Sequence, residues 1–127
     1  MTERIILAEE RRLKIEITEQ KSITTVLFSG TYDEEDIVLM KEMLSALIRN
    51  NRLKLILKFN HLEALAEDAF DYLKEMRNRV AQLGGAVVLV CSSEDRQEAC
   101  DRLKRTYDFL VFRSFDEARE HFIGREF

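Results

Sequence analysis

The period of the hydrophobic pattern changes several times along the chain, and each change predicts a new element. Leu13, Ile15 and Ile17 alternate with polar residues, as in a strand with one buried face. Between Asp33 and Asn50 the apolar residues instead recur every three or four positions, as on the buried stripe of a helix. The remaining pattern predicts strands at 23–28, 53–59, 86–91 and 109–112, and helices at 67–83, after Ser93 and after Ser114.

Turn and capping residues support several of these boundaries. Gly84-Gly85 follows the second helix and permits the left-handed backbone that often ends a helix. Ser92-Ser93 is expected to cap the charged helix that carries Ala99 and Leu103. Ser114 and Glu117 have the spacing of a capping box, which predicts the start of the last helix.

The order of elements, ββαβαβαβα, predicts an α/β fold with one mixed, mostly parallel β-sheet. Strands that are separated by helices run parallel through right-handed crossovers, whereas the four-residue connection 19–22 favours an antiparallel first strand. The wholly apolar run 86–91 is expected to lie mid-sheet, covered on both faces. With 127 residues and no linker or repeat, the chain is expected to be one domain, 1–127, with residues 1–12 as an N-terminal extension.

Composition and charge exclude several classes of function. The chain has 20 Lys and Arg against 24 Asp and Glu, a net charge of −4, whereas nucleic-acid-binding proteins usually carry a basic surplus. The longest apolar run is far shorter than the roughly 20 residues that span a bilayer, and no secretory signal is visible. We therefore expect a cytoplasmic protein that binds neither nucleic acid nor membrane, and whose Cys91 and Cys100 are buried or idle thiols rather than a disulfide.

Signatures of catalysis and of cofactor binding do not occur in the sequence. It contains no GxGxxG or GxxxxGK[ST] phosphate loop and no G-x-S-x-G nucleophile elbow. His61 and His121 are far apart and lie at no metal-ligand spacing from a cysteine. We therefore expect no enzymatic activity, no cofactor and no metal site, and we interpret His61 as a half-exposed loop residue.

Carboxylates are the exception, because they gather at the predicted starts of two helices. The helix dipole stabilises acidic residues there, which is a sufficient explanation without any function. Both starts nonetheless lie at the same rim of the sheet, and an acidic rim repels anionic substrates and attracts a basic protein surface or a divalent cation. Partner contact is the favoured interpretation, since no DxDxDG spacing is present. The residues concerned are Asp33, Glu34, Glu35, Asp36, Glu63, Glu67, Asp68 and Asp71.

Four segments in a fixed order carry a resemblance to a known family. Residues 27–33 have the pattern hydrophobic-x-Gly-x-x-Asp before the first helix, and residues 55–59 form a Leu-x-Leu-x-Phe strand. Residues 82–90 form a helix-to-strand junction, and residues 112–118 form the ending. Over residues 13–122 the chain thus resembles STAS domains, the anti-sigma-factor antagonists. The resemblance implies a STAS-like fold and a role in signal transduction by partner switching.

The resemblance draws attention to Asp68. In the family, a partner kinase that is also the anti-sigma factor phosphorylates the second hydroxyl residue of Asp-Ser-Ser/Thr-Gly-Leu, and phosphorylation breaks the complex. Residues 66–70 read Ala-Glu-Asp-Ala-Phe, so Asp68 stands at the phosphoacceptor position and serine phosphorylation is not expected. An aspartate carries −1 where phosphoserine carries about −1.5 to −2, so Asp68 mimics that state only in part or merely stabilises the helix start.

Three hypotheses follow. The first is a non-enzymatic interaction module whose partner, as the resemblance implies, is a regulatory protein such as an anti-sigma factor with a kinase-like ATPase domain; Phe70 is expected in the core stripe, and Asp71 and Tyr72 on the surface. The second is a small-molecule sensor or enzyme with a pocket under the first helix, lined by Tyr32, Met40 and Phe59. The third is a homo-oligomer in which residues 5–7 extend a neighbour's sheet. The partner-binding residues of the first hypothesis are Asp33, Glu34, Glu63, Glu67, Asp68, Asp71 and Tyr72.

Overall fold

The elements follow the predicted order in the computed structural model, which describes residues 12–91 and 98–124. The predicted cap at Ser92-Ser93 and the predicted strand addition by residues 5–7 lie outside the described residues. The elements are β1 (Lys14–Gln20), β2 (Ile23–Thr31), α2 (Asp36–Arg49), β3 (Lys54–Glu63), α3 (Glu67–Gln82), β4 (Ala86–Val90), α4 (Glu98–Arg105), β5 (Val111–Phe112) and α5 (Phe115–Gly124).

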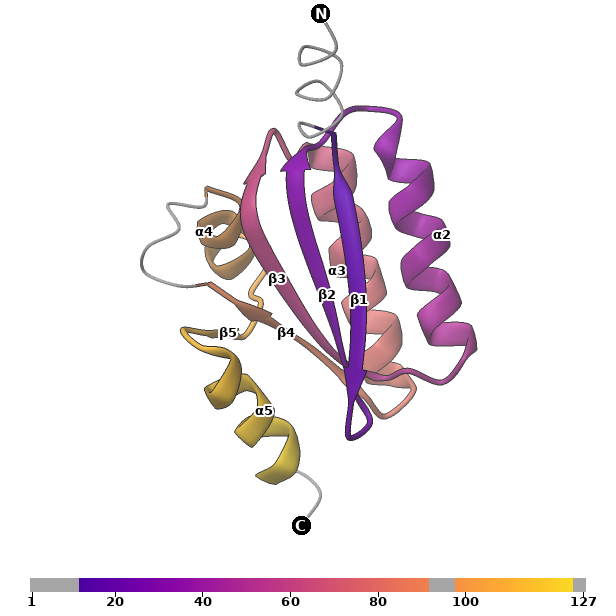
Figure 1. The fold of residues 1–127 in the computed structure, drawn as a ribbon, viewed down its shortest axis with the longest axis vertical. Helices are drawn as coiled ribbons and strands as arrows, with labels where there is room; N and C mark the ends of the chain where they lie inside the picture. The colour runs from indigo at the N-terminus through magenta and orange to yellow at the C-terminus, as the bar shows by residue number, and fades with distance from the viewer. Residues whose placement is uncertain (1–11, 92–97, 125–127) are drawn as a thin grey trace, which may run out of the picture.

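The five strands form one sheet in the order β1-β2-β3-β4-β5 (Figure 1). β1 pairs antiparallel with β2, and every later pair is parallel, so the mixed sheet with an antiparallel first strand is confirmed. β4 lies inside the sheet between β3 and β5, and its side chains are buried alternately on the two faces. The continuous apolar run therefore does predict a strand covered on both sides.

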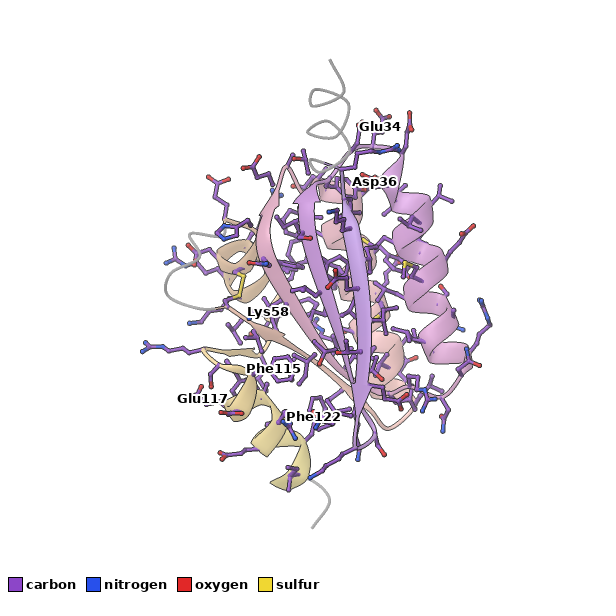
Figure 2. The ribbon with its side chains drawn as sticks, in the orientation of Figure 1. Glu34, Asp36, Lys58, Phe115, Glu117 and Phe122 are labelled. Atoms are coloured by element: carbon purple, nitrogen blue, oxygen red, sulfur yellow. A yellow bond between two sulfur atoms is a disulfide. The ribbon has the colours of Figure 1, made fainter. Side chains whose placement is uncertain are left out.

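Helices cover both faces of the sheet. Met40 and Leu44 of α2 and Leu73 of α3 pack with Val26 and Phe28 in the larger of two cores. On the opposite face, α5 places Ala118 and Phe122 against Ile23, Ile56 and Val88 in a smaller core, and Phe115 packs against it (Figure 2). Because α2 follows β2 and α3 follows β3, the starts of the two helices lie at the same rim of the sheet, at the carboxyl ends of β2 and β3.

Two predicted helix boundaries are visible as specific contacts. Gly84 ends α3 with φ of +90°, a conformation that glycine adopts without the steric cost of a Cβ atom. At the start of α5, Ser114 Oγ accepts the N–H of Glu117 at 3.2 Å, and the Glu117 carboxylate accepts the N–H of Arg113 at 3.3 Å. The reciprocal bond of the capping box is thus made one residue earlier than the motif predicts.

Cys91 and Cys100 form a disulfide, so the prediction of two separate thiols was wrong. Cys91 directly follows β4, and Cys100 lies in the first turn of α4, where it is buried. The Cα atoms of the two cysteines lie 6.3 Å apart, within the range that a disulfide bridges. A spacing of nine residues in the sequence contains no sign of this approach.

Candidate functional site

The eight carboxylates of the predicted site lie around the starts of α2 and α3, at the edge of the sheet formed by the carboxyl ends of β2 and β3. The backbone N–H of Tyr32, just before α2, donates to the carbonyl oxygen of Glu63, just before α3, at 2.9 Å, and so joins the two helix starts. Figure 2 shows Glu34 and Asp36 at the α2 end of this edge. We call these residues the acidic rim: Asp33, Glu34, Glu35, Asp36, Glu63, Glu67, Asp68 and Asp71.

The α2 part of the acidic rim is held by bonds among its own residues. The Asp36 carboxylate accepts the backbone N–H of Asp33 at 2.8 Å, and the Asp33 carboxylate accepts the N–H of Glu34 at 2.7 Å. Both N–H groups lie before α2, so these bonds fix the turn that leads into the helix. One turn later, Val38 and Leu39 are 59% and 41% exposed. This end of the rim therefore presents carboxylates beside exposed apolar side chains.

Asp68 at the start of α3 is bonded to a buried tyrosine. The Tyr32 hydroxyl donates to Asp68 Oδ1 at 3.0 Å, and the same oxygen accepts the N–H of Ala69 at 2.8 Å. Tyr32 is only 4% exposed. Burial, and then the bond to Asp68, raise the pKa of Tyr32 far above its usual value, so the phenol stays protonated and remains a donor. Asp68 is thus held in place from the β2–α2 connection.

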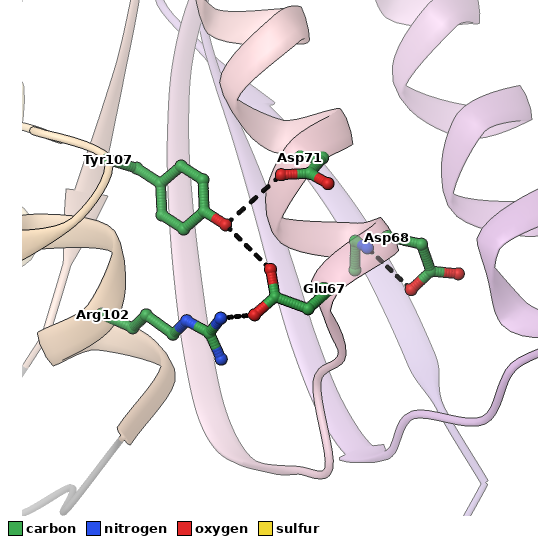
Figure 3. A network of polar contacts seen from close by, with 6 residues as sticks. Glu67, Asp68, Asp71, Arg102 and Tyr107 are labelled. Atoms are coloured by element: carbon green, nitrogen blue, oxygen red, sulfur yellow. Dashed lines mark hydrogen bonds and ion pairs between the residues drawn. The ribbon is translucent and has the colours of Figure 1, made fainter.

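Glu67 and Asp71 face α4 and the segment that follows it (Figure 3). Arg102 of α4 forms an ion pair with Glu67. The Tyr107 hydroxyl lies 3.2 Å from Glu67 Oε2 and 3.3 Å from Asp71 Oδ1, and its single proton can be donated to either. Part of the charge predicted to meet a partner is therefore balanced within the chain.

Phe70 lies beneath these polar contacts and is 2% exposed, which confirms its expected place in the core. Its ring stacks on Tyr107 with centroids 5.8 Å apart, and the Arg102 guanidinium lies 4.7 Å from the Phe70 centroid. A cation over an aromatic ring is attracted by the ring's negative face. Arg102 of α4 therefore contacts the start of α3 in two ways, through its ion pair with Glu67 and through the Phe70 ring.

Tyr72 does not lie on the exposed rim as predicted. It is half-buried against the larger core, its hydroxyl is 3.1 Å from Ser45 Oγ, and Lys41 Nζ lies 5.7 Å from its ring centroid. Ser45 and Lys41 both belong to α2, so Tyr72 packs between α2 and α3. An α3 residue that lies off the main apolar stripe can still be covered by a neighbouring helix, and helical periodicity does not report that neighbour.

The sequence did not single out Arg102 or Tyr107 as site residues, and it placed Tyr32 only in the pocket of the sensor hypothesis, not beside Asp68. Each acts through a partner 35 to 40 positions away in the chain, as with Tyr32 and Asp68 at a separation of 36 and Tyr107 and Glu67 at 40. The only sequence signal was indirect, namely an arginine on a short amphipathic helix and a tyrosine just after it. Neither pattern identifies which helix lies opposite.

A hollow of about 520 Å³ lies beside the rim, between the end of β3 and α4. Leu62, Leu65, Phe70 and Ala99 line it together with charged Glu63, Glu98 and Arg102. Tyr32, Met40 and Phe59, which the sensor hypothesis places around a pocket, are buried members of the larger core. Over residues 12–91 and 98–124, no helix is long and apolar enough to cross a membrane, and no group of three or more acidic, histidine or cysteine side chains is arranged to hold a metal.

Three solved structures with a similar fold are of anti-sigma factor antagonists. One from Mycobacterium paratuberculosis superposes with a TM-score of 0.72 at 12% identity, covering 87% of this chain and 94% of that one. The antagonist SpoIIAA in its unphosphorylated form gives 0.58 at 10% identity, covering 88% and 97%. The Bacillus cell fate determinant SpoIIAA in its phosphorylated form gives 0.60 at 11% identity, covering 87% and 98%.

At these identities the three structures establish a shared fold and nothing further. A search of curated proteins finds no match to the chain. The sequence model of the STAS domain family, however, matches residues 14–118, which include every element from β1 to the first residues of α5. The chain therefore belongs to the STAS domain family.

Proposed function

We propose that this STAS domain is a non-enzymatic regulatory module that binds a basic partner protein through the α2 part of the acidic rim. Exposed Glu34 and Glu35 lie beside exposed Val38 and Leu39, and this juxtaposition is the observation that carries the proposal. Apolar contact at the centre of an interface supplies affinity, while charge around it steers a partner of opposite sign. The proposed partner is a regulatory protein of the anti-sigma type with a kinase-like ATPase domain.

The α3 part of the rim is the poorer docking surface. Glu67 is paired with Arg102, and Tyr107 bonds to Glu67 and Asp71, so a partner would have to replace contacts already made. Tyr72 is packed against α2. A partner that approaches the α2 part meets the Asp33 and Asp36 carboxylates, which accept bonds from nearby backbone N–H groups, and docking does not require these bonds to break.

Asp68 supports a module that serine phosphorylation does not switch. It occupies the position of the phosphoacceptor in the family motif, it has no hydroxyl, and the Tyr32 hydroxyl holds its carboxylate at 3.0 Å. An aspartate supplies one negative charge that a kinase does not change, whereas phosphorylation of a serine adds a larger, removable charge. We propose that Asp68 keeps the module in one binding state.

Charge reversal at the α2 part tests the binding surface. The double variant Glu34→Lys/Glu35→Lys leaves the Asp33 and Asp36 carboxylates in place, so the helix start should remain intact. Its affinity for an anti-sigma factor with a kinase-like ATPase domain, measured by titration calorimetry, should fall at least tenfold, and the wild-type affinity should weaken with added salt.

The matched control is Asp116→Lys/Glu120→Lys, which makes the same change of net charge on α5, on the other side of the sheet. This control should bind like the wild type, and both variants should stay folded, with a loss of no more than about 2 kcal/mol from the lysines placed at helix starts. Equal losses in the two double variants would contradict the proposed surface. A phosphopeptide from residues 61–70 after incubation with the partner and ATP would contradict the constant state of Asp68.

A further inference from the structure

We propose that Cys91 and Cys100 form a reversible redox site that controls whether α4 stays docked on the start of α3. The disulfide joins the end of β4, a strand inside the sheet, to the first turn of α4. Cys100 is buried and Cys91 is half-buried, so the disulfide is buried at its Cys100 end and partly accessible to solvent at its Cys91 end. The bond thus fastens a short helix to the centre of the fold.

α4 has few other anchors. It has eight residues, and the buried ones are Ala99, Cys100 and Leu103. A helix this short is not stable by itself in water, so its place depends on tertiary contacts. Of these three buried side chains, Cys100 forms the disulfide, and only Ala99 and Leu103 pack without a covalent bond. Loss of the covalent bond therefore removes a large share of what holds α4.

The position of α4 decides how the start of α3 is covered. Arg102 lies on α4 just two residues after Cys100, and it pairs with Glu67 and covers the Phe70 ring. Tyr107 is anchored separately, because Arg77 of α3 donates to its carbonyl oxygen at 2.5 Å and Phe109 is buried beneath the Arg77 guanidinium. Release of α4 should thus free Glu67 and Phe70 from Arg102 while Tyr107 stays in place.

The chemistry is ordinary thiol–disulfide exchange with a dithiol reductant. A thiolate of the reductant attacks one sulfur of the Cys91–Cys100 bond, forms a mixed disulfide with it and releases the other cysteine as a thiol. The second thiol of the reductant then displaces the first cysteine, so the protein gains two electrons and two protons and the reductant becomes a disulfide. A low-molecular-weight disulfide such as oxidised glutathione reverses both steps.

Reduction should enlarge the acidic surface. In the oxidised chain Arg102 balances Glu67. In the reduced chain that carboxylate keeps its bond from Tyr107 but loses its cation, and the part of the Phe70 ring that Arg102 covered becomes available to a basic partner. This consequence rests on the proposed function, whereas the release of α4 does not. The reduced form is therefore expected to bind the partner more tightly than the oxidised form.

Hydrogen exchange followed by mass spectrometry tests the release of α4 without any partner. The full chain is compared in oxidised glutathione and in dithiothreitol. A disulfide that closes a loop of about this size shifts an opening equilibrium on the order of 50- to 100-fold, so amides of residues 98–103 should exchange at least tenfold faster after reduction. Peptides from β2, α5 and residues 106–109 should not change.

The variant Cys91→Ser is the matched control, because it removes the bond but keeps the buried Cys100. It should show the fast α4 exchange in both buffers, and reduced wild-type protein alkylated at its thiols provides the same test without a substitution. Exchange in α4 that is unaffected by reduction, or that rises equally across the whole chain, would overturn the redox site.

The partner is then titrated against the two redox forms. Tighter binding to the reduced form supports the link to the acidic rim. Faster α4 exchange with unchanged affinity overturns that link alone, since the separate Glu34→Lys/Glu35→Lys experiment judges whether the rim binds the partner at all.

Discussion

The starts of α2 and α3 look alike in the sequence, since each gathers four carboxylates around the first turn of a helix. In the structure, the bonds of the α2 start stay within four residues, as between Asp36 and the backbone of Asp33. The bonds of the α3 start instead reach the β2–α2 connection, α4 and the segment after α4, at sequence separations of 35 to 40. The carboxylates at the α2 start bond within their own turn, whereas those at the α3 start bond to distant parts of the chain.

This difference separates two uses of the same residue type. Acidic side chains that bond to the backbone of their own turn, such as Asp33, stay exposed and available to a partner. Acidic side chains that pair with Arg102 and Tyr107 contribute to holding α4, and a partner can reach them only after those contacts break. Charge alone therefore does not define a docking surface, and the partners of each charge have to be known.

Truncation of Phe70 should give the largest contrast between the two regions. Phe70→Ala removes a buried ring that contacts both Tyr107 and Arg102, and such changes cost about 3–5 kcal/mol of unfolding free energy. The matched variant Val38→Ala on α2 changes a side chain that is 59% exposed and should cost less than about 0.5 kcal/mol. Urea unfolding of both variants measures the difference, and equal costs would mean that the α3 start is no more integral than the α2 start.

Loss of the Tyr32 hydroxyl should have an intermediate effect that depends on pH. Tyr32→Phe removes the donor to Asp68 and should cost about 1 kcal/mol near pH 8. The pKa of Tyr32 is raised in the folded chain above its unfolded value near 10, so the native state keeps a proton that the unfolded state releases. This contribution is complete below pH 10 and is lost as the pH rises above it.

The measurement is urea unfolding of wild type and Tyr32→Phe at pH 8 and at pH 10.5. The wild type should lose more stability than the variant over this interval, and the gap between them should narrow. A gap that is constant across the interval would show that the Tyr32 phenol titrates alike in the folded and unfolded chains.

Most of this fold can be predicted from the sequence because its helices and strands follow from the local periodicity of hydrophobic residues. The alternation at Leu13, Ile15 and Ile17 marks β1, and the glycine pair at 84–85 marks the end of α3. The order of the elements then leaves few topologies, since crossovers are right-handed and short connections are antiparallel. The predicted rim followed directly from that topology.

The partners of the rim residues could not be predicted in the same way. Tyr72 satisfies the rule for an exposed position on α3, yet α2 lies over it. Cys91 and Cys100 carry no spacing signature, yet the first turn of α4 lies beside the end of β4 and brings them together. In each case the deciding contact joins two elements whose relative placement depends on packing, and periodicity along one element contains no information about the element opposite.

The ion pair between Glu67 and Arg102 should show the smallest effect and the most specific one. Both side chains are largely accessible, at 63% and 42%, so their coupling in a double-mutant cycle of Glu67→Gln and Arg102→Met should not exceed about 1 kcal/mol and should shrink in 0.5 M NaCl. The pair between Arg52 and Glu19, similarly exposed and away from the rim, is the matched control and should show a coupling of the same small size.

The two single variants should nonetheless differ, because Arg102 also covers the Phe70 ring and Glu67 does not. Arg102→Met should therefore retain a cost at high salt, of the order of 0.5 kcal/mol, after the charge coupling has been screened. Glu34→Gln at the α2 start should cost almost nothing at either salt concentration. If Arg102→Met became equal to Glu67→Gln in 0.5 M NaCl, α4 would be held to α3 by charge alone, and the stacking seen at Phe70 would add no stability.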